Sequence, residues 1–148
     1  MRIGEICSRD VLTAEPSDAL AKCAKAMGER NVGSVVVVDR SGGFARPIGI
    51  LTDRDILRGQ FDRHSDLYCL NAGDVMTANP LVLKEDCDVR NAIDCMGQRA
   101  VRRVPVVDSG GELVGIVTFD DLLPAIAGQI AAIAGLVSQQ IENRRVRS

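Results

Sequence analysis

Two copies of a short motif carry the chemistry that this sequence offers. Gly49–Asp55 and Gly115–Asp121 each place a threonine three residues before an aspartate. At a helix start this pair forms a capping box, in which each side chain binds a backbone N–H group. The same helix start also favours an anion, and the threonine hydroxyl can add a bond to a phosphate. The aspartate can accept hydrogen bonds from two vicinal ribose hydroxyls. The two roles are compatible, and the motif alone leaves both open.

The other reactive side chains do not assemble an active site. The five cysteines include no C-x-x-C pair, which fits neither a disulfide framework nor a zinc site, so we expect reduced thiols. Cys23 and Cys95 lie in helical apolar patterns and are expected to pack in the core. His64, the one histidine, lies in a polar connection and is either an exposed loop residue or a phosphate contact. We therefore expect no catalysis and no required metal.

An internal repeat positions the two motifs. A shift of 69 positions places Gly4 on Gly73 and Val37–Asp39 on Val106–Asp108. After a longer turn in the first copy, a shift of 66 positions places Gly49–Asp55 on Gly115–Asp121. This period exceeds that of solenoid repeats. We therefore expect a duplicated domain half, with each copy burying its apolar face against the other.

Each copy predicts the order strand, helix, strand, strand, helix. Continuous β-branched runs indicate strands covered on both faces, and Thr52 and Thr118 open the second helices. The predicted strands are Val11–Ala14, Val35–Val38 and Ile48–Leu51, then Leu81–Leu83, Val104–Val107 and Leu113–Val117. The predicted core stripes of the first helices are Leu20, Ala24 and Met27, then Val89, Ile93 and Met96, with Ser17 and Asp86 as N-cap candidates.

These strings together resemble a pair of CBS domains. In the second copy they are Asp74–Thr77, Val101–Asp108, Gly115–Thr118 and Asp121–Leu123, and their order, spacing and duplication make the similarity specific. The resemblance implies an α/β fold of tandem CBS domains packed with pseudo-twofold symmetry, often called a Bateman module, with two clefts between the repeats. We place the first domain at residues 1–60, a linker at 61–72, the second domain at 73–125, and a C-terminal helix and tail at 126–148.

The resemblance also implies an adenosine-containing ligand. In the family the motif aspartate holds the ribose and the threonine lies near phosphate, which assigns these roles to Asp55 and Asp121, and to Thr52 and Thr118. The segments before the valine strands line the clefts as well. The candidate ligand-binding residues are Thr13, Gly33, Ser34, Val35, Thr52, Arg54, Asp55, Val82, Arg102, Arg103, Val104, Pro105, Thr118 and Asp121. The candidate ligands are AMP, ADP, ATP, NAD, S-adenosylmethionine and a cyclic dinucleotide.

The two copies differ where a ligand would bind. The first copy has Ser34–Val36 where the second has Arg103–Pro105, so it lacks the basic pair Arg102 and Arg103 as well as the proline. Arg54 aligns with Asp120, so each copy contributes a different candidate cation for phosphate. Because adjacent strand residues face opposite ways, we expect one arginine of the pair in a given cleft. The sequence leaves open whether one or both clefts are occupied. Asp121→Ala is expected to weaken nucleotide binding more than Asp121→Asn, and a smaller loss for Asp55→Ala would support occupancy of one cleft.

The C-terminal segment predicts a long amphipathic helix. Its apolar residues recur every three or four positions, and Pro124 is expected to kink the first turns. The helix either folds back on its own core or packs on a second subunit, and its small residues favour an interface in a homodimer. The large apolar residues are Leu122, Ile126, Ile130, Ile133, Val137 and Ile141, and the small ones are Ala127, Gly128, Ala131, Ala132, Ala134 and Gly135.

Bulk properties narrow the class of protein. The chain has 148 residues, of which 46% are hydrophobic and 26% charged, with a net charge of −2, as in one ordinary globular unit. Its basic residues are scattered, which disfavours nucleic acid. The N-terminus shows no signal sequence, and no run approaches the roughly 20 apolar residues of a membrane span, so we expect a cytoplasmic protein without membrane contact.

These observations favour a non-catalytic regulatory module. It is expected to bind an adenosine-containing ligand between its repeats and to transmit the ligand state to a partner protein that the sequence does not identify. The alternative is a protein-interaction or dimerisation adaptor with vestigial clefts, in which the Thr-x-x-Asp boxes serve only as helix caps.

Overall fold

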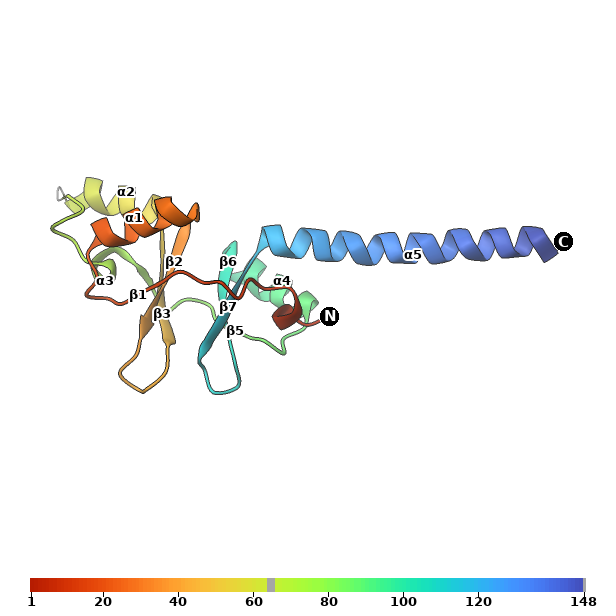
Figure 1. Ribbon diagram of the computed structural model, residues 1–148, viewed down its shortest axis with the longest axis horizontal. Coiled ribbons are helices and arrows are strands. Elements are labelled where there is room, and N and C mark those ends of the chain that lie inside the picture. Colours follow the sequence, from red (N-terminus) through yellow and green to blue (C-terminus); the bar gives the residue numbers. More distant parts are fainter. Residues whose placement is uncertain (64–65, 148) are drawn as a thin grey trace.

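Two similar α/β halves and one projecting helix make up the computed structural model, which describes residues 1–63 and 66–147 (Figure 1). His64 lies outside the described residues. The first half contains η1 (Ile3–Glu5), β1 (Thr13–Ala14), α1 (Leu20–Arg30), β2 (Ser34–Asp39), β3 (Arg46–Thr52) and α2 (Asp53–Arg63). The second contains α3 (Ala72–Val75), β4 (Thr77–Ala78), β5 (Leu83–Lys84), α4 (Val89–Arg99), β6 (Arg103–Val107), β7 (Leu113–Thr118) and α5 (Phe119–Arg147). The predicted order of elements is confirmed in both halves.

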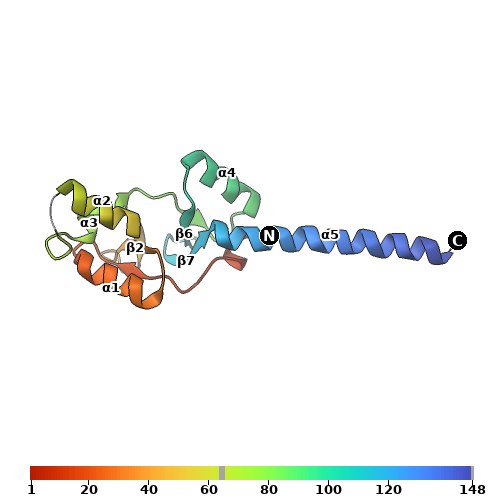
Figure 2. The same ribbon diagram turned by 90° about the horizontal axis from the view of Figure 1, so that it is seen from above.

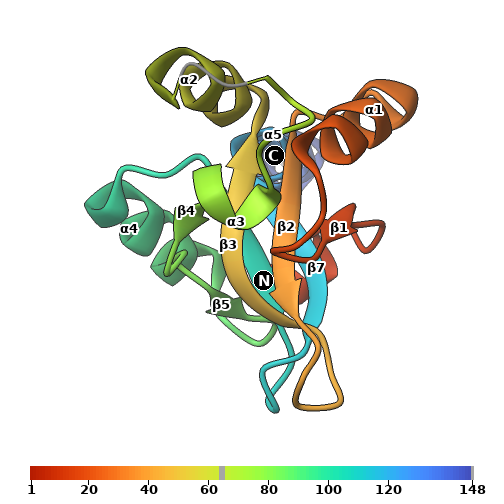
Figure 3. The ribbon, with the colours of Figure 1, turned by 90° about the vertical axis from the view of Figure 1, so that its left-hand side faces the viewer.

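The valine runs form the buried centre of each half. β2 pairs antiparallel with β3 and parallel with β1, and β6 pairs in the same way with β7 and β5. Residues Val35–Val38 are at most 1% exposed, which confirms a strand covered on both faces. Val35 and Val37 pack on the helix side, whereas Val36 and Val38 face β7 of the other half. The two sheets therefore meet through β2 and β7, and Figure 3 shows the β2–β3 hairpin in front of β7.

Each half is completed by the segment that leads into the other half. Thr77 on β4 pairs with Ile50 on β3, and Ser8 forms a β-bridge with Ile116 on β7. The core of the first half includes Leu70 and Ala72, and that of the second includes Ile3. This exchange of leading segments was not predicted, because hydrophobic periodicity shows that a face is buried but not which copy covers it.

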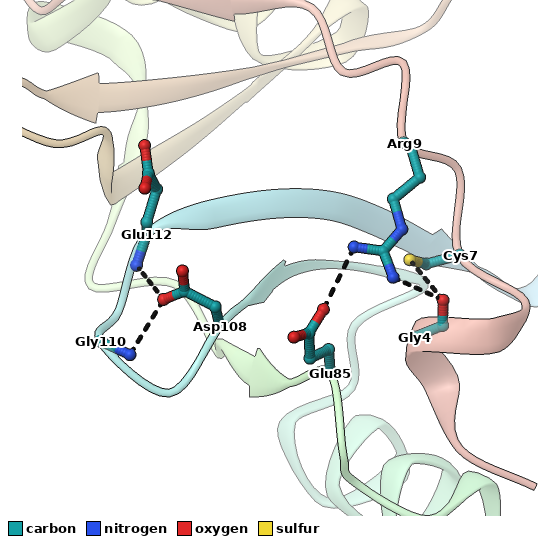
Figure 4. A network of polar contacts seen from close by, with 7 residues as sticks. All are labelled: Gly4, Cys7, Arg9, Glu85, Asp108, Gly110 and Glu112. Carbon is teal, nitrogen blue, oxygen red and sulfur yellow. Dashed lines mark hydrogen bonds and ion pairs between the residues drawn. The ribbon is translucent and has the colours of Figure 1, made fainter.

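The N-terminal segment is anchored to the second half by polar contacts (Figure 4). The amide of Gly4 donates to the carbonyl of Glu85 at 2.9 Å. The guanidinium of Arg9 bonds the Glu85 carboxylate at 3.1 Å and the Gly4 carbonyl at 2.8 Å. Because this ion pair is exposed, we expect it to contribute no more than about 1 kcal/mol. The backbone bond and the burial of Ile3 therefore do more to hold the segment.

The exchanged segments also cap the first helix of each half. The first amide of α1, from Leu20, donates to Leu70 O at 2.9 Å, and the next, from Ala21, donates to Leu67 O at 3.1 Å. The amide of Val89 in α4 donates to Met1 O at 3.0 Å. The prediction that Ser17 and Asp86 are the N-caps is wrong: Ala19 and Asp88 hold these positions, neither with a side-chain cap bond. Backbone carbonyls from the other copy satisfy the amide groups instead.

The predicted core stripes hold with one exception. In α1, Leu20 and Met27 are buried and Ala24 is half-buried against the same core, and in α4 Val89 and Met96 are buried. Ile93 is 38% exposed, so its placement in the core stripe is wrong, and Ala92 fills that position. The core position predicted for Cys23 is confirmed, and burial raises the pKa of its thiol, which keeps the group protonated at neutral pH. Cys95 is half-buried against the second core.

The helix α5 runs unbroken for 29 residues and projects away from both halves (Figures 1 and 2). Pro124 lies inside it without ending it. Leu122 is buried in the second core and Ile126 packs at its edge. Beyond them the stripe is open to solvent, with Ile130 63% and Ile133 62% exposed. The predicted helix is confirmed, and in this structure it does not fold back on its own core.

The same helix meets the length and composition of a membrane span. Its most apolar 18-residue window has a mean hydropathy of 1.5, and 6% of that window is buried. No charged residue lies between Asp121 and Glu142. The prediction that no run approaches the length of a membrane span is therefore wrong. Length and composition by themselves are weak evidence that a helix spans a membrane.

The contact between the N-terminal segment and β7 predicts an intolerant glycine. A Cβ atom at Gly115 would lie 2.8 Å from the backbone oxygen of Ser8 and 2.7 Å from Cys7 Sγ. We expect Gly115→Ala to destabilise the fold by about 1–3 kcal/mol, seen as a lower melting temperature, because the backbone must shift. Gly128→Ala is the matched control: nothing lies within 4 Å of that Cβ position in α5, and we expect a gain of about 0.4–1 kcal/mol. An unchanged melting temperature for Gly115→Ala would contradict the packing of residues 7–8 on β7.

Candidate functional site

A cleft of about 350 Å³ lies where the first half's motif meets the second half. This volume is within the usual range of small-molecule sites. Its walls come from the end of β3 and the start of α2 on one side, and from the segments before β5 and β6 on the other. The lining residues are Ile50, Thr52, Asp53, Arg54, Asp55, Thr77, Pro80, Leu81, Val101, Arg102 and Arg103.

Thr52 and Asp55 cap α2 at the floor of this cleft. The amide of Thr52 donates to Asp55 Oδ2 at 2.9 Å, and the amide of Asp55 donates to Thr52 Oγ1 at 3.1 Å. The capping role that the sequence left open is therefore confirmed for Thr52 and Asp55. In the part of the chain that the structure describes, Asp55 Oδ1 makes no hydrogen bond, so an acceptor remains for a ligand hydroxyl.

Three arginines from both copies line the same cleft. Arg54 lies in the first turn of α2, and Arg102 and Arg103 lie at the start of β6. The Arg102 guanidinium lies 5.8 Å from the centroid of the Phe119 ring. Arg103 Nη1 lies 3.4 Å from the Cβ position of Gly33. Both residues of the pair line this cleft, but the Arg102 guanidinium lies over the Phe119 ring, which is not part of the lining, so one arginine side chain per cleft stays a prediction. The candidate cations of the two copies converge beside Asp55.

The related position in the second half has the opposite charge balance. The amide of Thr118 and its hydroxyl donate to Asp121 Oδ2, at 2.9 and 3.2 Å. By the repeat alignment, Arg54, Arg102 and Arg103 are replaced there by Asp120, Gly33 and Ser34, and Asp53 is replaced by Phe119. The first cleft has three arginines and two aspartates, whereas the aligned positions for the second motif have two aspartates and no arginine.

A half-buried thiol lies near this second motif. Burial raises the pKa of Cys7 above its usual value, the charge of Arg9 lowers it, and the charge of Asp121 raises it again. The net shift is upward, which keeps the thiol protonated at neutral pH and leaves it a poor nucleophile.

Several predicted site residues lie elsewhere. The side chains of Val35, Val104 and Pro105 are fully buried, so the cleft can meet only their backbone. Thr13 and Val35 line a separate cavity of about 30 Å³, far too small for a nucleotide. Val82 is half-buried and is not among the residues that line the large cleft. Gly33 is near the large cleft, because Arg103 Nη1 lies 3.4 Å from the Cβ position of Gly33. Ser34 pairs with Thr52 on β3.

Sequence reasoning missed the part of the cleft that the exchange of leading segments supplies. Thr77, Pro80 and Leu81 lie in the segment that crosses onto the first half, and Asp53 and Val101 complete the walls. A proline and a threonine before a short strand carry no local signal of a site. Within residues 1–63 and 66–147, no group of three or more His, Cys, Asp or Glu side chains is placed to hold a metal ion.

The fold and the cleft define a tandem α/β repeat protein with a ligand-sized site between its repeats. The family model of the CBS domain matches residues 3–62 and 72–128, which confirms the resemblance proposed from the sequence. The chain belongs to the CBS domain family.

Curated relatives share the repeats but differ in length. An uncharacterized protein of Methanopyrus kandleri is 34% identical over 88% of this chain and 65% of its own length. An uncharacterized 17.7 kDa protein of Acidianus ambivalens is 34% identical over 84% of this chain and 73% of its own length. Inosine-5'-monophosphate dehydrogenase of Methanocaldococcus jannaschii is 30% identical over 80% of this chain but only 22% of the enzyme.

Solved structures with the same fold include two with adenosine compounds. The CBS domain pair of protein MJ0100, in complex with 5'-methylthioadenosine and S-adenosyl-L-methionine, has a TM-score of 0.74 at 26% identity, covering 87% of this chain and 98% of that one. CBSX2 in complex with AMP has a TM-score of 0.72 at 27% identity, covering 88% and 98%. A hexameric CBS-CP12 protein from bloom-forming cyanobacteria has a TM-score of 0.73 at 26% identity, covering 83% and 69%.

The contribution of the Thr52–Asp55 capping box to the stability of the fold can be measured directly. Thr52→Val keeps the branched shape but removes the oxygen that accepts the Asp55 amide. We expect a loss of about 0.5–2 kcal/mol in the free energy of unfolding, measured with denaturant and without ligand. Thr77→Val is the matched control, because Thr77 lines the same cleft and its hydroxyl makes no hydrogen bond among the described residues. Equal losses for both variants would show that the box does not stabilise α2.

Proposed function

We propose that this protein is a non-catalytic regulatory module that binds a phosphorylated adenosine ligand, such as AMP, ADP or ATP, in the cleft beside Asp55. The observation that carries the proposal is the convergence of Arg54, Arg102 and Arg103 on a cleft whose floor is a helix N-terminus. Guanidinium groups and free helix amides both favour phosphate oxygens. The AMP complex of CBSX2 supports a ligand of this class.

The proposed ligand orientation follows from the chemistry of the walls. The ribose hydroxyls donate to Asp55, whose Oδ1 makes no bond within the described residues. The phosphate lies among the arginines at the start of α2. Ile50, Leu81 and Val101 form an apolar surface for the adenine ring. S-adenosylmethionine and NAD remain alternative ligands, and the MJ0100 complex supports the first of them.

The regulatory role is proposed because the cleft suits a bound ligand and the relatives give no support for a catalytic activity of this chain. The similarity to inosine-5'-monophosphate dehydrogenase extends over 22% of that enzyme, so it supports no catalytic activity here. We propose that the chain works in the cytoplasm, where adenosine nucleotides are available, and that it signals to a protein that is still to be found. Its self-association as a homodimer through α5 is part of the proposal, supported by the exposed apolar stripe and by the hexameric relative.

An adaptor with vestigial clefts is the second candidate. The complete capping box at Thr52 and Asp55 favours it, because the box accounts for both residues without a ligand. The two functions differ in whether a small molecule stabilises the fold, so ligand-induced melting shifts distinguish them.

Saturating AMP should raise the melting temperature. A ligand at about 100 times its Kd adds about 2.7 kcal/mol, or roughly 5–10 °C for a protein of this size. We expect Arg103→Ala to reduce the AMP shift while leaving a shift by adenosine unchanged, because that side chain meets phosphate. Arg40→Ala, on the β2–β3 turn away from the cleft, should change neither. If none of AMP, ADP, ATP, NAD and S-adenosylmethionine changes the melting temperature, the adaptor function describes this protein better than the ligand-binding one.

The two motif aspartates should contribute unequally. Two hydroxyls bonded to a carboxylate contribute about 1.5–3 kcal/mol each, so Asp55→Ala should weaken AMP binding tenfold or more, and Asp55→Asn less. We expect a smaller loss for Asp121→Ala, because the arginines lie beside Asp55. Calorimetry measures the affinities, and melting temperatures without ligand correct for the lost cap. Wild-type affinity in Asp55→Ala would leave that carboxylate only its capping role.

A further inference from the structure

We propose that two copies of the chain pair through α5 in an antiparallel arrangement, with the basic end of each helix beside the first turn of its partner's α5. This deepens the homodimer part of the proposed function and rests on it. The residues that carry it are the large aliphatic side chains of one helix face, which we name the α5 stripe, and the charged residues at the two helix ends. The α5 stripe consists of Leu122, Ile126, Ile130, Ile133, Val137 and Ile141.

From Ile130 to Ile141 the α5 stripe is an open face suited to a second helix, whereas Leu122 and Ile126 already pack on the second core. Its members follow a four-four-three spacing, an eleven-residue repeat that keeps one face along a nearly straight helix pair. From Ile130 onward every member is at least 48% exposed in the isolated chain. The opposite face carries Gly128, Ala131, Gly135 and Ser138. One face therefore has the bulk to interlock with a partner, and the other does not.

The distribution of polar residues favours a protein partner over a bilayer. A membrane span meets lipid on all sides and is apolar all round. In α5 the residues Gln129, Ser138, Gln139 and Gln140 interrupt the apolar stretch, and three of these four are adjacent. Gln139 lies away from the α5 stripe and stays in water when a helix partner covers the stripe, and Gln129 and Gln140 lie at the border of the stripe.

The charges at the two ends favour a second copy and set its direction. The first turn carries Asp120 and Asp121, and the last turns carry Arg144, Arg145 and Arg147. The helix is about 43 Å long, so its ends lie several Debye lengths apart and interact only with whatever lies beside them. A parallel pair would set arginines beside arginines. An antiparallel pair sets arginines beside aspartates and also opposes the helix dipoles.

The register follows from the centre of the helix. Ile133 is the middle residue of Phe119–Arg147, so a twofold axis there places Ile133 against its partner's Ile133. The same register sets the partner's basic end at the height of Asp120 and Asp121 along the helix axis. Asp120 is the exposed residue that replaces Arg54 in the second half. The partner's basic end thus supplies positive charge to the helix start whose own half has no arginine at the related positions.

Sedimentation of the full-length chain at tens of micromolar tests the pairing. We expect a dimer for the wild type, a monomer for Ile133→Glu, and a dimer for the matched control Ala131→Glu on the opposite face. A monomeric wild type, or equal disruption by both variants, overturns the proposal. Flotation with phosphatidylcholine and phosphatidylglycerol vesicles should leave the protein unbound, and co-flotation would overturn it in favour of a bilayer.

Charge reversal at low salt tests the direction. In an antiparallel pair, replacing all three arginines, as in Arg144→Glu, Arg145→Glu and Arg147→Glu together, should raise the dimer dissociation constant tenfold or more. Adding Asp120→Lys should restore pairing. In a parallel pair the triple variant would relieve repulsion and tighten the dimer, which would overturn the antiparallel arrangement. Circular dichroism controls for helix content.

Failure of the α5 pairing can be distinguished from failure of the proposed nucleotide binding. The AMP-induced melting shift is measured on the same variants, none of which lines the cleft at Asp55. A retained shift in a protein that does not pair removes only the α5 inference. An absent shift in a protein that does pair removes only the nucleotide site.

Discussion

The packing of each leading segment on the opposite sheet is the constraint on which the rest of the structure depends. It closes both cores, supplies the carbonyls that cap α1 and α4, and brings residues 77–81 to the wall of the cleft. Gly115 is required because the backbone of Ser8 lies against it. The site therefore exists only in the paired fold: its floor comes from the first half and much of its wall from the second.

The same pairing turns small sequence differences between the copies into a large difference between the two motif positions. Because the start of β6 lines the cleft at the first half's motif, Arg102 and Arg103 join Arg54 there, and by the repeat alignment Gly33 and Ser34 are their equivalents for Asp121. Duplication would otherwise produce two similar clefts. Three substitutions concentrate the positive charge on one side of a pseudo-twofold axis, which is why we assign the phosphate to that side.

Much of the fold could be predicted from the sequence, because the repeat doubles every local signal. The valine runs and both motifs lie where the alignment places them, and the full capping box forms at Thr52, whereas at the second motif, within the described residues, only Asp121 binds a backbone amide, that of Thr118. The errors share one cause. Ser17 as a cap and Ile93 as a core residue both depend on which copy supplies a neighbour, and periodicity along one chain does not contain that information. Ile93 is 38% exposed although the adjacent Ala92 is buried, so spacing alone does not determine which residues of a helix face the core.

The contact between Arg102 and Phe119 links the proposed ligand to α5. Phe119 is the first residue of that helix, its amide donates to Arg102 O at 3.1 Å, and its ring lies under the Arg102 guanidinium. A cation–π contact at a partly exposed position contributes about 0.5–1 kcal/mol, whereas a charge-assisted bond to phosphate contributes about 1.5–3 kcal/mol. In the proposed module a phosphate therefore draws Arg102 from the ring, and the first turn of α5 loses a contact that holds it. This contact is therefore the point at which a ligand in the proposed cleft meets the helix that carries the α5 stripe.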